Sequence, residues 1–105
     1  KIHFSACQEI QFNQQLAGFN RKQIVVTGTE SHVCVLQTCL DLIAKGYQVF
    51  VVEDAIASRN EKHKELAIKQ LLAAGAIITC TESVIFQWLE KAGTDQFRAL
   101  LQLIK

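Results

Sequence analysis

Cys34 has the setting most suited to covalent chemistry, because it follows a strand and a turn that contains one glycine. The apolar run Ile24–Val26 leads through Gly28 into a short polar stretch, and a helical pattern begins near Val33. Strand, turn and helix in this order hold a reactive group above the end of a parallel sheet. In the first turn of a helix, free N–H groups and the helix dipole favour a thiolate. The same N–H groups could stabilise an oxyanion on a carbonyl that the thiolate attacks.

The helix that follows separates the cysteines by face. A repeat of 3.6 residues places Cys39 in the apolar stripe, so we expect it in the core as a small hydrophobic side chain. Cys34 falls on the opposite face, and its position leaves two interpretations open: a nucleophile, or a buried thiol beneath a polar turn. Cys7 and Cys80 lack such a setting, and we interpret both as structural. The stripe is Leu36, Cys39, Leu40 and Ile43; the opposite face carries Cys34, Thr38, Asp41 and Lys45.

Two polar residues near these turns have competing interpretations. His32 could act as a base for Cys34, but a histidine on a tight turn need not point at the thiol. A histidine hydrogen-bonded to backbone is the interpretation we favour. Asp54 ends a strand, where a dinucleotide-binding fold places an acid for the ribose. The first turn has one glycine instead of three, so we expect Asp54 to organise its loop through Ser58 and Arg59.

The elements that must position these residues alternate along the chain. Continuous β-branched runs are typical of strands covered on both faces, and amphipathic stretches with glycine stops predict helices. The alternation predicts an α/β fold, in which a parallel, Rossmann-like sheet lies between helices in three layers. Capping-box spacing places helix starts at Ser58 and Thr79. The expected helices are 8–18, 33–45, 58–74, a short one from Thr79, and 97–104; the expected strands are 24–27, 48–52 and 76–78.

Composition excludes several classes of protein. The 105 residues predict a single domain, and half of them are hydrophobic, which argues against disorder. The net charge is +1 without a basic run, so neither nucleic acid nor a membrane surface is an expected partner. The four cysteines match no metal or haem spacing, and we expect reduced thiols, a cytoplasmic protein and neither a cofactor nor a metal.

Several short segments together resemble one known family. The stretch from Gly28 to Thr38 resembles the nucleophile segment of isochorismatase-like cysteine hydrolases, which include nicotinamidases and N-carbamoylsarcosine amidohydrolase. The strongest likeness is to the isochorismatase domain-containing proteins and their bacterial relatives. It covers essentially the whole chain, and the combination of segments is specific. The other segments are Asp54-Ala55, Ser58-Arg59, Ala74-Gly75-Ala76 and Glu82-Ser83.

The resemblance implies a site and a reaction. Cys34 would attack an amide or related C–N bond of a small molecule and form a thioester. Lys1, which begins a match to the family's Lys-x-x-Phe-Ser segment, would stabilise the thiolate and steer protons. The backbone N–H groups of Glu30 and Cys34 would form the oxyanion hole. A cis peptide between Thr29 and Glu30 would accompany that hole, at a cost of about 3–4 kcal/mol.

The family pattern also predicts that residues 1–105 are the C-terminal part of the hydrolase domain, incomplete at the N-terminus. The family's sheet has more parallel strands than the three found here, and its triad aspartate precedes the lysine. We therefore expect upstream strands that bring an aspartate beside Lys1, and a homo-oligomer, a dimer or larger, formed partly by the helices that carry Trp88 and Phe97. Two alternatives are a non-catalytic oligomeric scaffold of the same fold and a nucleotide-binding α/β module.

Overall fold

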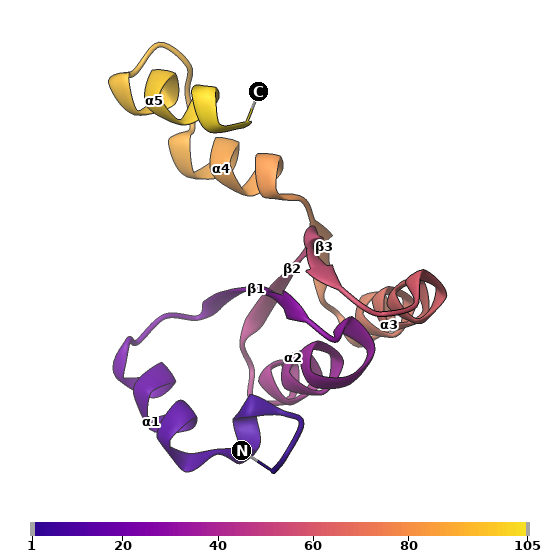
Figure 1. The fold of residues 1–105 in the computed structure, drawn as a ribbon. Coiled ribbons are helices and arrows are strands. Elements are labelled where there is room, and N and C mark those ends of the chain that lie inside the picture. Colours follow the sequence, from indigo (N-terminus) through magenta and orange to yellow (C-terminus); the bar gives the residue numbers. More distant parts are fainter. Residues whose placement is uncertain (1, 105) are drawn as a thin grey trace.

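A three-stranded parallel sheet organises the chain (Figure 1), which we describe from a computed structural model over residues 2–104. Its strands are β1 (Gln23–Thr29), β2 (Gln48–Ala57) and β3 (Ile77–Thr79). They lie in the order β1-β2-β3, so β2 is central and has a parallel neighbour on each side. The α/β fold class is confirmed, and the three strands lie where the apolar runs predict them, although β2 continues past the predicted end at Asp54 to Ala57.

Irregular pairing marks the carboxyl end of β1. Val26 pairs with Val51, but Gly28 pairs with Ile56, so the register shifts between these two positions of β1. Such a bulge disrupts the ladder locally and redirects the strand. Gly28 has φ of +143°, a conformation that side chains with a Cβ rarely adopt. The bulge and the glycine lie directly before the turn that carries Cys34.

The helices follow the amphipathic segments, although two of them start differently from the prediction. Asn60, not Ser58, caps α3 by accepting a hydrogen bond from the Lys62 N–H. Cys80 occupies the cap position of α4, so Thr79 does not fill the predicted capping box. The elements are a 3₁₀ turn (Ala6–Gln8), α1 (Ile10–Gly18), a π-helical turn (Ser31–Val35), α2 (Leu36–Ala44), α3 (Glu61–Ala74), α4 (Thr81–Leu89) and α5 (Asp95–Ile104).

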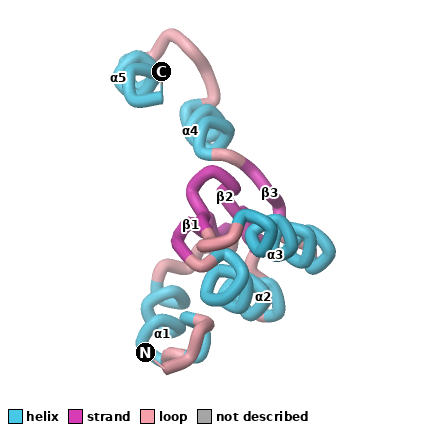
Figure 2. The backbone as a smooth tube through the Cα atoms, turned by 45° about the vertical axis from the view of Figure 1, so that its right-hand side comes forward, coloured by secondary structure: helices cyan, strands magenta, loops and turns pink. Residues whose placement is uncertain are grey.

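The hydrophobic core lies between the sheet and one layer of helices. Helices α2 and α3 lie on the same side of the strands (Figure 2), and their apolar faces meet alternate residues of β2. Cys39 is fully buried there, which confirms its predicted place in the core. The most deeply buried side chains of this layer are Cys39, Leu42, Val49, Val51 and Leu71.

The opposite face of the sheet is more open. Helix α4 lies on that side and leads outward to α5 (Figure 1). Val84 of α4 is buried, but Val25 of β1 remains 41% exposed. The prediction that β1 is covered on both faces does not hold within residues 2–104, because the helices pack mainly on the other face. No helix in this described range is long and apolar enough to cross a membrane.

Candidate active site

The turn after β1 combines two unusual backbone features. Glu30 adopts the left-handed conformation, with φ of 60° and ψ of 61°. The Val35 N–H then donates to the Glu30 carbonyl at 3.3 Å, which gives the next turn its π-helical spacing. Both features are infrequent and concentrate at functional sites. Cys34 lies half-buried inside this turn, at the carboxyl end of the edge strand β1.

The Thr29–Glu30 peptide is trans, because residues 2–104 contain no cis peptide bond. The prediction of a cis bond at this position was therefore wrong. The left-handed conformation of Glu30 reverses the chain instead, at about 1–2 kcal/mol for a residue with a Cβ.

Side chains tie this turn to the one that follows β2. Glu30 Oε1 lies 3.5 Å from Arg59 Nε, and His32 Nδ1 lies 2.9 Å from Ser58 Oγ. The His32 ring also lies 5.0 Å from the His63 ring, measured between centroids. The favoured interpretation of His32, a hydrogen bond to backbone, was wrong, because a side-chain hydroxyl is its partner. His32 directs Nδ1 toward Ser58 and not toward Cys34.

A groove of about 380 Å³ runs along the free edge of β1 and reaches Cys34. Most of its lining is apolar and comes from the strand, α2 and the N-terminal segment. The polar residues in its lining are Cys34 and three threonines. The lining residues are Phe4, Ala6, Phe12, Ile24, Val25, Val26, Thr27, Gly28, Thr29, Cys34, Val35, Thr38 and Leu42.

The segment that follows Lys1 is fixed to α2 by hydrogen bonds. Ser5 Oγ donates to Asp41 Oδ2 at 2.6 Å, and the Ala6 N–H donates to Thr38 Oγ1 at 3.0 Å. Helical spacing predicts that Thr38 and Asp41 lie on the same face as Cys34. Nothing in the sequence indicates that these two side chains bind the N-terminal segment. Lys1 itself lies outside the described residues.

The thiols differ in their surroundings, and all four are free. Burial, with the nearby Cys7 thiol, raises the pKa of Cys39 to about 12. Burial also raises the pKa of Cys7, against the lowering effect of its hydrogen bond to Ser5. Cys34 and Cys80 are only half-buried, so these two thiols are the more accessible to reagents.

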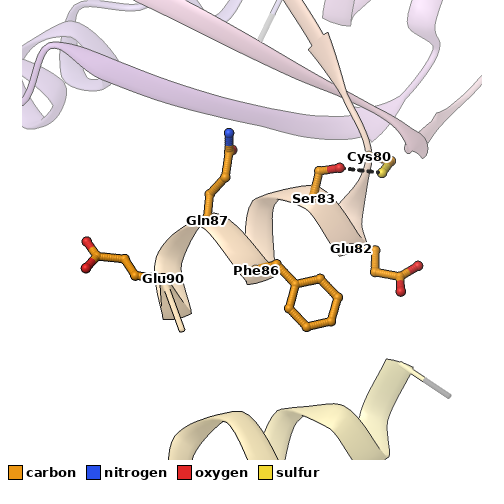
Figure 3. A pocket seen from close by; sticks show the side chains of 6 residues that line it. All are labelled: Cys80, Glu82, Ser83, Phe86, Gln87 and Glu90. Carbon is orange, nitrogen blue, oxygen red and sulfur yellow. Dashed lines mark hydrogen bonds between the residues drawn. The ribbon is translucent and has the colours of Figure 1, made fainter. Parts of the chain in front are cut away.

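A second pocket, of about 680 Å³, lies along α4 and does not include Cys34 (Figure 3). Cys80 donates to Ser83 Oγ at 3.2 Å at its edge. Phe86 points toward α5, where its ring lies 6.1 Å from that of Phe97. The charged side chains in the lining are Glu82 and Glu90, which no cation balances within the lining. Among residues 2–104, no three His, Cys, Asp or Glu side chains form a group able to hold a metal ion.

Asp54 fixes the start of α4 and does not organise its own loop. Its Oδ1 accepts hydrogen bonds from the Thr81 N–H at 2.8 Å and from the Thr81 hydroxyl at 2.9 Å. The expected partners Ser58 and Arg59 instead contact His32 and Glu30. The two bonds from Thr81 lower the pKa of Asp54 from 3.8, chiefly through the backbone N–H.

We predict that Asp54→Asn lowers the melting temperature at pH 7, because it weakens the cap of α4. A carboxylate whose pKa is lower in the folded state stabilises the fold above its unfolded pKa. That contribution is lost as the pH falls through the folded value. Thermal melts should therefore show a gap in melting temperature between wild type and variant, and this gap should close as the pH falls below 3.8. Glu53→Gln, which neutralises the exposed neighbouring carboxylate, should show no such gap.

The comparison with protein families matches residues 1–83 to the isochorismatase domain. A secreted isochorismatase effector of Phytophthora sojae is 47% identical over 85 residues, which are 81% of this chain and 40% of the relative. Isochorismatase domain-containing protein 2 of Bos taurus is 36% identical over 98 residues, 93% of this chain and 46% of the relative. The chain thus spans less than half the length of these relatives.

Solved structures agree with the family match. A MAR1 ribonuclease of Caenorhabditis elegans is 36% identical, with a TM-score of 0.88 over 99% of this chain and 53% of its own. A nicotinamidase of Bacillus subtilis is 26% identical, with a TM-score of 0.71 over 75% of this chain and 44% of its own. An octameric hydrolase of unknown specificity from Escherichia coli is 29% identical, with a TM-score of 0.74 over 76% of this chain and 39% of its own.

These likenesses agree with the sequence segments that resemble the family and with the parallel sheet of the fold. The family match covers more than three quarters of the chain and includes every strand. The chain belongs to the isochorismatase family.

Proposed function

We propose that this chain supplies the nucleophile half of a cysteine hydrolase that cleaves an amide or related C–N bond of a small molecule. The observation that carries the proposal is the place of Cys34, half-buried in a π-helical turn beside the groove at the end of β1. The likeness to a solved nicotinamidase supports the choice of a C–N bond.

In this proposal the Cys34 thiolate attacks the carbonyl carbon. A tetrahedral intermediate forms, the C–N bond breaks, and the nitrogen leaves as ammonia or an amine after it takes up a proton. Water then hydrolyses the thioester and regenerates the thiol. Lys1 stabilises the thiolate and steers protons, and the N–H groups of Glu30 and Cys34 receive the oxyanion. The proposed mechanism needs no cofactor, and the proposed setting is the reducing cytoplasm, where free thiols persist.

We further propose that the complete enzyme has additional strands upstream of residue 1. The edge of β1 has no neighbour within residues 2–104, and one face of this strand remains exposed. An unpaired apolar edge is otherwise a site of aggregation, and proteins pair or cover such edges. An added parallel strand along the groove would place its carboxyl end near Cys34, where an aspartate could pair with Lys1.

Limited alkylation with iodoacetamide tests the role of Cys34. We predict that Cys34 is labelled first in the folded protein and that labelling remains rapid below pH 8. Cys39 should be nearly inert at pH 7, because a pKa near 12 makes its thiolate on the order of 10³-fold scarcer than that of an ordinary thiol. Peptide mapping after brief exposure gives the order of labelling.

Cys80 is the internal control for accessibility, since it is also half-buried but lies at the start of α4. If Cys80 reacts faster than Cys34, the proposed nucleophile is wrong. That result would favour the alternative of a non-catalytic scaffold with the same fold. The nucleotide-binding alternative has less support, because the turn after β1 has a single glycine and carries the acid Glu30.

We also propose that the protein forms a homo-oligomer through α4 and α5. Trp88 is 71% exposed and Leu103 is 78% exposed, and both belong to the two helices that extend away from the sheet (Figure 1). Large apolar side chains gathered outside the core are typical of protein interfaces. The octameric likeness from Escherichia coli agrees with assembly of this fold.

Leu103→Glu should therefore shift the protein to a smaller species in size-exclusion chromatography with light scattering. The new carboxylate would have to be buried without a partner in the interface, which opposes association. Gln102→Glu is the matched control, because it adds the same charge at the adjacent exposed position of α5. An unchanged mass for Leu103→Glu would exclude this part of α5 from the interface.

A further inference from the structure

The N-terminal segment is held on α2 at two adjacent points. Ser5 is 2% exposed, and its hydroxyl donates to Asp41 Oδ2 at 2.6 Å while accepting from the Cys7 N–H at 3.1 Å. The next residue donates its N–H to Thr38 Oγ1 at 3.0 Å. The Gln8 amide also reaches Asp41 Oδ2, at 3.3 Å. Two helix side chains thus hold three residues of the segment, Ser5, Ala6 and Gln8.

The same two side chains lie on the helix face that presents Cys34. Thr38 and Asp41 are four and seven residues after the thiol, which is one and two turns along a helix. Thr38 also lines the groove that contains Cys34. The π-helical turn that contains Cys34 leads directly into α2, which carries both points where the N-terminal segment is attached.

We propose that Thr38 and Asp41 are positioning residues that hold the Lys1 segment in register with Cys34. This inference rests on the proposed function. Lys1 precedes the anchored Ser5 by four residues in the sequence. Loss of either hydrogen bond frees the segment and withdraws the lysine charge from the thiol, although neither residue touches the reacting atoms.

The test measures the rate of Cys34 alkylation by iodoacetamide across pH in the full-length polypeptide. Thr38→Val and Asp41→Asn should each slow labelling at pH 7 by about tenfold, because the lysine charge would no longer favour the thiolate. The rate should return to the wild-type value above about pH 9.5, where an ordinary thiol is largely ionised without help. A variant that merely altered access to Cys34 would change the rate at every pH.

The direction in which Asp41→Asn changes the labelling rate distinguishes a positioning role from a direct effect of the Asp41 charge on Cys34. Asp41 lies about 10 Å along the helix from Cys34, and removal of its negative charge would by itself favour the thiolate and speed labelling. Positioning predicts the opposite, a slower reaction. Thr38→Val should have the same effect without any change of charge, and Thr38→Ser, which keeps the acceptor oxygen, should restore the rate.

Two comparisons complete the design. Asp54→Asn removes a carboxylate that also accepts two hydrogen bonds, but at the start of α4, and should leave Cys34 labelling unchanged. In a Lys1→Gln background, Thr38→Val and Asp41→Asn should cause no further loss, because they act through the lysine.

The inference would be overturned if Asp41→Asn left the labelling rate of Cys34 unchanged or raised it. It would also be overturned if the rate losses of Thr38→Val and Asp41→Asn added to the loss caused by Lys1→Gln. Either result would leave the proposed function standing. A wild-type Cys34 that is no more reactive than Cys80 would instead overturn the proposed function, and the inference with it. Thermal melts of each variant identify any loss of folding, and Thr38→Ser keeps the inference testable if Thr38→Val unfolds.

Discussion

Hydrolysis should fall by about 10³-fold or more when Cys34 is replaced by alanine, because the nucleophile of a covalent mechanism has no substitute. We expect the melting temperature to change little, since Cys34 is only half-buried and lies outside the apolar stripe of α2. The measurement is ammonia release from nicotinamide and related simple carboxamides, with full-length wild-type protein as the reference. Residues 1–105 alone should give no turnover, because the proposed aspartate lies upstream.

Cys80→Ala is the matched control for Cys34→Ala. It removes the other half-buried thiol, and its activity should equal that of the wild type. Full activity in Cys34→Ala would contradict the proposed mechanism. Turnover by residues 1–105 alone would leave Cys34 as the nucleophile but contradict the need for upstream strands.

Leu71→Ala should destabilise the fold by about 2–5 kcal/mol, the range for a large-to-small change in a packed core. Leu71 is fully buried, and it packs from α3 into the cluster that contains Val49 and Val51 of the central strand. The truncation leaves a cavity between α3 and the sheet, and surrounding side chains collapse into it only partly. Denaturant unfolding at constant slope measures the loss of free energy.

Leu72→Ala is the matched control for this prediction. The two leucines are neighbours in α3, but Leu72 is 55% exposed and makes no part of the core cluster. Its truncation should change the free energy of unfolding by about 0.5 kcal/mol or less, as for most surface changes. Equal losses for the two variants would contradict the described packing of α3.

The sequence alone was sufficient to predict the order of strands and helices and the parallel fold class. These features depend on local periodicity, which the side chains of each segment carry themselves. Cys39 follows the same logic: its spacing from the neighbouring apolar residues of α2 places it in the core, where the structure finds it fully buried. The setting of Cys34, after a strand and at a helix start, is likewise a local pattern.

The errors occur where a local rule competes with a distant partner. Thr79 has the spacing of a cap for α4, but the acceptor for the Thr81 N–H is Asp54, 27 residues away from Thr81 in sequence. Ser58 has the spacing of a cap for α3, yet its hydroxyl contacts His32, at a separation of 26 residues, and Asn60 caps the helix in its place. Capping rules consider only neighbours in sequence, and folding brought other acceptors and donors within reach.

The candidate site shows most clearly which features are local in sequence and which depend on distant partners. The residue types and their spacing predict which thiol is best placed for chemistry, and they predict that Cys34 shares a helix face with Thr38 and Asp41. Only the tertiary structure decided that Ser5, 36 residues from Asp41, is attached to that face, and that Glu30 turns the chain with a trans peptide. Helical spacing is a property of one segment, whereas an attachment between segments exists only after the sheet and helices have packed.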